Sequence, residues 1–164
     1  MKNFISANSY CKHITDGTHD SPGYTKSGFH LLTSKYIIGG KLNIKDSPLI
    51  SETDYNKINE RSKVEQWDIL FSMIGTVGEV CLVNKYPSFA IKNMGLFKCK
   101  NEIDAKFLYY YFQSPLAKVK NTELLAGSTQ QYITLSNLKS YPIPEFNCES
   151  KQHIVNTNSS NNLI

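Results

Sequence analysis

Short apolar stretches alternate with polar, turn-rich ones along this chain. Alternation over residues 10–15 predicts a short strand, and the Gly-, Pro-, Asp- and Ser-rich residues 16–28 that follow predict a loop. Apolar residues resume as a strand over 29–38, and the pair Gly39–Gly40 turns the chain into residues 41–44, which alternate as a hairpin partner would. Residues 1–10 show no strong period, so we expect only a lead-in there.

A helix is predicted after Ser51. Asp54 lies three residues later, as in a capping box, and Tyr55, Ile58 and Asn59 follow at helical spacing. The most strand-like part of the chain is 66–84, which carries apolar runs on both sides of Gly75 and Gly78.

These two glycines predict a tight structural turn between strands. Residues 88–100 predict one or two further strands. An apolar stripe then predicts a helix over 105–113, and Pro115 is expected to separate it from a second short turn.

The order of these elements predicts an α+β fold, with a strongly twisted β-sheet and short flanking helices. We expect one domain over residues 1–147, because 164 residues suffice for one well-buried core. Residues 148–164 are expected to hold a helix of about seven residues near Glu149, followed by a disordered tail. The tail is predicted because residues after Val155 are mostly Asn, Thr and Ser, which bury little apolar surface.

The composition bears on the cellular compartment and on the kind of partner. The four cysteines are scattered without a CxxC pair, and the first ten residues do not resemble a signal peptide, so we expect free thiols in the cytoplasm. The apolar stretch 69–78 is about half the length of a membrane helix, so no membrane span is expected. The net charge of +4 permits an anionic partner without requiring one.

The sequence gives little support for a catalytic site or a metal site. Cys11 could be paired with His13 or His19 as nucleophile and base, but no oxyanion-type glycine motif accompanies them. The cysteines and histidines match no zinc spacing, and the turn at 75–78 lacks the Lys-Ser/Thr of a phosphate loop. We therefore expect no catalytic residue, metal or cofactor, and interpret the aromatic run 109–112 as packing.

Two loops carry side chains suited to nucleic acid. Residues 16–26 and 126–132 join small residues to Thr, His, Ser, Gln, Tyr and Lys. Gln suits adenine, and Lys suits phosphate or guanine. The same composition is also common in solvated turns, so chemistry alone leaves both readings open.

Five segments taken together resemble a known family. In order and spacing, "ITDGTHDSPGY", the Ile-Ser-Glu-x-x-Tyr helix at 50–55, "WDILFSMIGTVGEVCLV", "FLYYYFQSP" and "GSTQQYITLSNLKSYPIP" are similar to the target-recognition domain of type I restriction-modification specificity subunits. The resemblance spans about residues 10–155.

The resemblance implies a non-catalytic reader of double-stranded DNA. In that family a full subunit carries two such domains, each reading one half of a bipartite site, and helices between them dock methyltransferase subunits, with which a restriction subunit works. On this basis we expect the DNA side to be lined by Thr18, His19, Tyr24, Lys26, Lys92, Asn93, Ser128, Thr129, Gln130, Gln131 and Tyr132.

The chain departs from the family pattern at three places. Trp67 stands where the family usually has Gly, so we expect that turn to differ, and only Asn93 remains of an Asn-Gln pair. Glu149 is kept after Pro144, but the Gln is shifted to Gln152. The helical arm then stops, so we expect one recognition half that is a monomer alone. The alternative is a protein-interaction domain or a small enzyme of the same fold without DNA specificity.

Overall fold

The computed structural model describes residues 3–126 and 131–161. Within these ranges the strands form two four-stranded sheets and two two-stranded ribbons. The central sheet is antiparallel, in the order β2 (His13–Asp16), β11 (Met94–Lys98), β8 (Asp68–Ser72) and β9 (Val80–Leu82). The outer sheet has the order β10 (Phe89–Ile91), β4 (Phe29–Leu32), β7 (Leu49–Ile50) and β3 (Tyr24–Thr25), with β10 parallel to β4.

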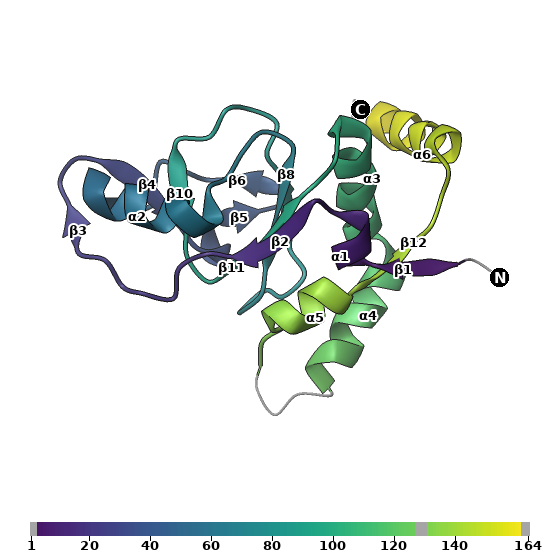
Figure 1. Ribbon diagram of the computed structural model, residues 1–164, viewed down its shortest axis with the longest axis horizontal. Coiled ribbons are helices and arrows are strands. Elements are labelled where there is room, and N and C mark those ends of the chain that lie inside the picture. Colours follow the sequence, from purple (N-terminus) through teal and green to yellow (C-terminus); the bar gives the residue numbers. More distant parts are fainter. Residues whose placement is uncertain (1–2, 127–130, 162–164) are drawn as a thin grey trace.

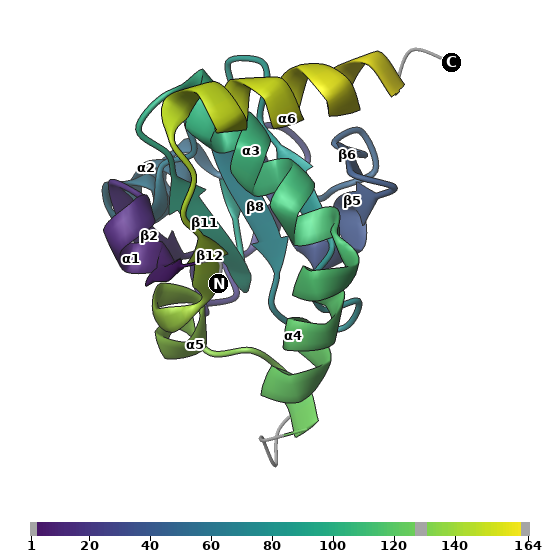
Figure 2. The same ribbon diagram turned by 90° about the vertical axis from the view of Figure 1, so that its right-hand side faces the viewer.

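Helices lie on both sides of the central sheet (Figure 1). The outer sheet and α2 (Glu52–Ser62) lie on the left of that view. On the right are α1 (Ala7–Tyr10), α3 (Glu102–Gln113), α4 (Pro115–Ala126), α5 (Leu135–Ser140) and α6 (Cys148–Asn161). Figure 2 shows α3 in front of β8, with α6 crossing above it. The expected α+β class is confirmed, although the strands divide among several sheets.

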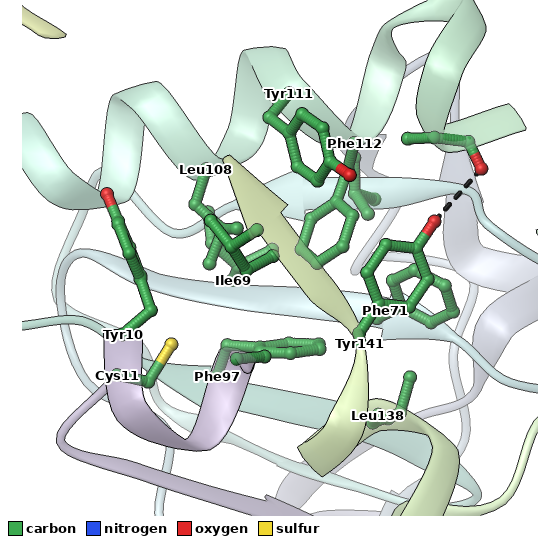
Figure 3. Close-up of a cluster of buried hydrophobic side chains, with 14 of the residues drawn as sticks. Tyr10, Cys11, Ile69, Phe71, Phe97, Leu108, Tyr111, Phe112, Leu138 and Tyr141 are labelled. Atoms are coloured by element: carbon green, nitrogen blue, oxygen red, sulfur yellow. Dashed lines mark hydrogen bonds between the residues drawn. The ribbon is translucent and has the colours of Figure 1, made fainter. Parts of the chain in front are cut away.

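The central sheet is buried on both faces. All five residues of β8 are buried: Ile69 and Phe71 pack against the helices, whereas Leu70 belongs to the cluster toward the outer sheet. Figure 3 shows the helix-side cluster, in which the ring of Phe112 meets Phe71 edge-on at 5.2 Å between centroids. Burying one such side chain contributes about 1.5–3 kcal/mol. A continuous apolar run is what a strand buried on both faces requires.

Several local predictions are confirmed. The hydroxyl of Ser51 accepts the backbone N–H of Asp54 at 3.1 Å and caps α2. The hairpin around Gly39–Gly40 pairs β5 (Ile37–Ile38) with β6 (Lys41–Leu42). Between β8 and β9, Gly75 and Gly78 have φ of 78° and 90°, the left-handed region that favours glycine.

The predicted lead-in is wrong. Residues 4–6 form β1 (Phe4–Ser6), which pairs with β12 (Pro142–Pro144), and α1 follows directly. The backbone N–H of Ala7 donates to the carbonyl of Tyr141 at 2.8 Å. These partners lie near the other end of the chain, so no local period reveals them.

Three element boundaries also differ from expectation. The strand predicted over 29–38 breaks into β4, the 3₁₀ helix η1 (Ser34–Tyr36) and β5. Helix α3 begins three residues early because the Asn101 side chain accepts the N–H of Asp104 at 2.9 Å. The short turn after Pro115 is α4, twelve residues long, with Ala117 and Asn121 buried.

The tail predicted to be disordered after Val155 is helical to Asn161. Helix α6 packs along α3: Lys151 Nζ lies 2.6 Å from a carboxylate oxygen of Asp104, and the hydroxyls of Tyr110 and Ser159 lie 3.1 Å apart. Val155 of α6 is buried in the helix-side core cluster. Tertiary packing therefore supports a helix that its composition does not favour.

Trp67 precedes β8 with φ of 71°. This is the backbone region that glycine favours, so the turn keeps a glycine-like conformation despite the larger residue. The expected difference from the family's turn stays a prediction. A non-glycine residue there costs roughly 1–2 kcal/mol, and the ammonium of Lys106 lies 5.5 Å from the Trp67 ring centroid, which offsets part of that cost.

Candidate functional site

The chain passes between the two sheets at two segments that touch each other. One runs from the end of β2 through Gly17 and Thr18, and the other joins β10 to β11 through Lys92 and Asn93. Thr18 and Lys92 form a parallel bridge, and the N–H of Asn93 donates to the carbonyl of Thr18 at 3.1 Å. We call residues 16–21 together with 92–93 the junction site.

Close backbone approach explains the glycine in this segment. The N–H of Gly17 donates to the carbonyl of Met94 at 2.8 Å. A Cβ at Gly17 would collide with the carbonyl oxygen of Ile91. Asn93 has φ of 52°, so the chain reverses there through a left-handed residue. The backbone thus holds the side chains of residues 18, 19, 92 and 93 in one place.

His19 lies between two oxygen-bearing side chains. Its Nε2 is 2.9 Å from Oδ2 of Asp16, and its Nδ1 is 2.8 Å from Oδ1 of Asn93. The Asp16 side chain is only 7% exposed, whereas that of His19 is 63% exposed. The histidine therefore links a buried carboxylate to an amide at the surface.

Arg61, in the last turn of α2, supplies a positive charge that pairs with the carboxylate of Asp16. Its Nη2 lies 3.2 Å from Oδ1 of Asp16 and donates to the backbone carbonyls of Asp16 and Gly17 at 3.1 and 2.9 Å. A buried carboxylate is costly unless it is paired and hydrogen-bonded, and here it has both kinds of partner. Arg61 also ties α2 to the junction site.

The loop after His19 is fixed by two more contacts. Lys92 Nζ donates to the hydroxyl of Ser21 at 2.6 Å, and the N–H of Asp20 donates to the hydroxyl of Thr18 at 3.1 Å. The loop and α2 enclose a groove of about 590 Å³. It is lined by Thr18, His19, Asp20, Ser21, Pro22, Asp54, Lys57, Ile58, Glu60, Arg61 and Ser62.

Tyr132 joins the same surface from the other side. It forms an antiparallel bridge with Ile74, and the N–H of Ile133 donates to the carbonyl of Met73 at 3.0 Å. Thr134 then caps α5 in a reciprocal capping box with Asn137. A cavity of about 300 Å³ separates this segment from the junction site, lined by Asp16, His19, Met73, Ile74, Asn93, Tyr132, Thr134 and Leu135.

The structure therefore brings together some of the residues expected from the sequence. Thr18, His19, Lys92 and Asn93 meet in the junction site, and Tyr132 faces the adjoining cavity. Gln131 is exposed next to Tyr132. Ser128, Thr129 and Gln130 lie outside the described residues.

Tyr24 and Lys26 are placed elsewhere. Tyr24, which is 71% exposed, belongs to β3, the edge strand of the outer sheet, and Lys26 is exposed just after it (Figure 1). No contact between these two residues and the junction site occurs in the described part of the chain. Any role they have would be carried out at the edge of the outer sheet.

Sequence reasoning missed Asp16 and Arg61. Asp16 stands three residues before His19, a spacing that hints at contact, but the sequence predicts only a loop there. Arg61 is 45 residues from Asp16 along the chain, so no local pattern connects them.

Two cysteines lie in surroundings that raise the pKa of the thiol. Cys11 is buried, and the pKa of Cys99 is raised well above its usual value, first by a hydrogen bond with Cys11 and then by burial. Burial likewise raises the pKa of Cys81 to about 11. A reactive thiol needs a lowered pKa, so these two environments work against the small-enzyme alternative. No group of three or more possible metal ligands occurs among the described residues, and no helix there is long and apolar enough to cross a membrane.

Comparison with known proteins gives a family. The sequence model described as "Type I restriction modification DNA specificity domain" matches residues 25–157, more than half of the chain. A comparison with curated protein sequences finds no match.

Solved structures share the fold, among them three from type I restriction-modification systems. One comes from work on the assembly and conformational transition of the type I R-M system, with a TM-score of 0.71 and 18% identity over 98% of this chain and 38% of that one. The S subunit of a type I restriction-modification system from M. genitalium has a TM-score of 0.62 and 20% identity, covering 97% of this chain and 39% of that one.

The HsdS subunit from Thermoanaerobacter tengcongensis has a TM-score of 0.69 and 15% identity over 94% of this chain and 35% of that one. The chain thus spans less than two fifths of the length of each of the three structures.

Proposed function

We propose that this chain, which belongs to the type I restriction modification DNA specificity domain family, reads one half of a bipartite duplex site through its junction site. Family membership makes it a non-catalytic DNA specificity module. The surface it uses and the half-site role are the content of the proposal.

The observation that carries the proposal is the meeting of His19, Lys92 and Asn93 at one end of the central sheet. Amide and imidazole groups can bond to base edges, and a lysine can contact phosphate. Here these groups come from two chain segments that are locked together by backbone hydrogen bonds. Such fixed placement is what discrimination between base pairs requires, because a mispositioned donor loses its directional hydrogen bond.

Two additional segments are assigned to the same function. Tyr132 lines the cavity beside Asn93, and the exposed Gln131 and residues 128–130 precede it in sequence. Tyr24 and Lys26, at the edge of the outer sheet, are proposed to contact the DNA backbone farther along the duplex. Lys57 and Arg61 on α2 line the groove beside the junction site as further cations.

The half-site role is supported by size. The chain covers 38%, 39% and 35% of the three similar structures, which fits one recognition domain of a longer subunit. We propose that methyltransferase and restriction subunits are its partners in a type I system, and that the chain alone is a monomer in the cytoplasm. Free cysteines suit that reducing compartment. Sedimentation of the chain alone tests the monomer: a stable dimer at micromolar concentration would contradict it.

DNA recognition is tested by binding. The full chain is mixed with a library of duplexes that share a randomised central stretch, and bound duplexes are enriched over several rounds. We expect a recurring short sequence, and binding to it that weakens steeply between about 50 mM and 200 mM salt. Failure to enrich any sequence, together with salt-independent binding, would overturn the proposal in favour of a protein-interaction role.

A further inference from the structure

Asp16 has a second side-chain partner, His19, which is not needed to compensate for the burial of its carboxylate. Arg61 alone supplies a cation within 3.2 Å of the carboxylate and two further hydrogen bonds to the backbone beside it. The side chain of His19 is mostly exposed, so solvent screens its contact with Asp16 and the contact adds little to stability. The contact between Asp16 and His19 is therefore poorly explained by stability alone.

The contact does have a geometric consequence at the surface. Carboxylate and amide oxygens can only accept, so Nε2 of His19 donates to Asp16 and Nδ1 donates to Oδ1 of Asn93, an arrangement that places a hydrogen on both ring nitrogens. The distance from Nδ1 to Oδ1 of Asn93 is 2.8 Å. The orientation of the Asn93 amide is thus set by a buried charge two side chains away.

Asn93 keeps one group free for a ligand. Within the described residues, no protein group accepts a hydrogen bond from its Nδ2, and the side chain lines the 300 Å³ cavity together with Ile74 and Tyr132. An amide nitrogen donates to acceptors on a base edge, such as N7 of a purine or O4 of thymine. The exposed side chain of Ile74 beside it offers an apolar surface for the neighbouring part of the base pair.

From this arrangement we propose that Asp16 is a positioning residue for DNA reading, acting through His19 to aim the amide of Asn93 at an acceptor on a base edge. The inference rests on the proposed function and goes beyond it in two respects. It names the amide of Asn93 as a group that reads a base, and it names Asp16 and His19 as the residues that position this amide. Arg61 anchors Asp16 in turn, so α2 is coupled to the reading surface.

The test uses the full chain and the duplex that the wild type enriches from the randomised library. Asp16→Asn keeps the size of the side chain and removes its charge. We expect the ratio of affinities for the enriched and random duplexes to fall about tenfold, the equivalent of one misplaced base contact. The control is Asp68→Asn, which removes a carboxylate of matched burial at the opposite end of the same sheet and should leave the ratio within about twofold.

A second arm remains informative if Asp16→Asn does not fold. His19→Gln changes an exposed residue, and Asn93→Gly retains the left-handed backbone while removing the amide. Each should lose about the same factor in preference, and the double variant should lose no more than the larger single loss, because the two side chains act as one unit. Losses that multiply would overturn the inference.

Nitrogen-detected NMR of the His19 ring in the free protein supplies a readout independent of binding. The wild type should show a slowly exchanging proton on Nε2, which disappears in Asp16→Asn but persists in Asp68→Asn. A wild type that enriches DNA while Asp16→Asn keeps both its preference and this proton contradicts the inference alone. A wild type that enriches nothing overturns the proposed function and the inference with it.

Discussion

The central sheet carries a buried carboxylate at each end, and the two are used differently. Asp16 closes β2 beside Gly95 of β11, and Asp68 opens β8 opposite Lys98 of the same strand. Their side chains are 7% and 6% exposed. Burial is thus matched, and only the partners differ.

At the Asp68 end the polar groups satisfy one another. Lys98 Nζ lies 2.9 Å from Asp68 and 2.8 Å from Glu65, and the N–H of Glu65 donates to Asp68 at 2.8 Å. Burial raises the pKa of Asp68, although its contacts with Lys98 oppose this. The hydrogen bond from Lys98 lowers the pKa of Glu65.

At the Asp16 end the contacts continue outward. Arg61 and His19 are both more than half exposed, and His19 passes the interaction on to Asn93. A buried charge can therefore either close a network within the core or orient side chains at the surface. The distinction depends on whether its partners have further groups facing solvent.

The largest expected effect is on stability at the Asp68 end. Lys98→Met leaves a buried carboxylate without its cation and should cost about 3–5 kcal/mol of unfolding free energy. Arg61→Met at the other end should cost only about 1 kcal/mol, because the arginine is largely exposed and solvent screens its contact with Asp16. Urea unfolding of both variants measures the difference. Equal costs would mean that the two ends are not distinct.

Gly17→Ala should break the geometry of the junction site. The added methyl collides with the carbonyl oxygen of Ile91, and forcing such overlap costs roughly 1–3 kcal/mol. The control is Gly75→Ala, which has open space around its Cβ but a φ of 78° and should cost about 1 kcal/mol from strain alone. Only Gly17→Ala should also reduce the preference for the enriched duplex. Normal preference in a destabilised Gly17→Ala would separate the junction from DNA reading.

Replacing Gln131 by Ala should affect DNA binding without affecting folding, because the residue is exposed. If Gln131 reads a base, affinity for the enriched duplex falls by about 1–3 kcal/mol and affinity for random duplex is unchanged.

Lys26→Ala should weaken binding to both duplexes alike and reduce the salt dependence. Fluorescence anisotropy at several salt concentrations measures both effects. Unchanged binding in both variants would remove these residues from the DNA side.

The smallest effect concerns pH. The pKa of Asp68 is raised in the folded protein, so between its unfolded and folded pKa values the folded state binds more protons. Its contribution to stability therefore decreases as pH rises through that window and is constant above it. The stability of the wild type relative to Asp68→Asn should accordingly be greatest near pH 4 and decline toward neutral pH. Urea unfolding of both proteins across this pH range measures the difference in stability. A difference that grows with pH would contradict the prediction.

Local chemistry in the sequence was sufficient for several features. The cap at Ser51, the hairpin at Gly39–Gly40 and the turn at 75–78 depend on neighbouring residues and are found where expected. Apolar runs identified β8 and β9 for the same reason. The family, too, could be inferred from five segments in order, because their succession is a property of the chain.

Other features depend on contacts between distant residues. The first strand pairs with residues 142–144, and α6 extends through a polar run because it packs along α3. The meeting of His19 with Asn93 spans 74 residues, and that of Arg61 with Asp16 spans 45. Neither pair leaves a local period, since side chains far apart in sequence become neighbours only when the strands carrying them are placed. The contact between Arg61 and Asp16 could therefore be recognised only from the tertiary structure, which brings them together at the junction between the two sheets.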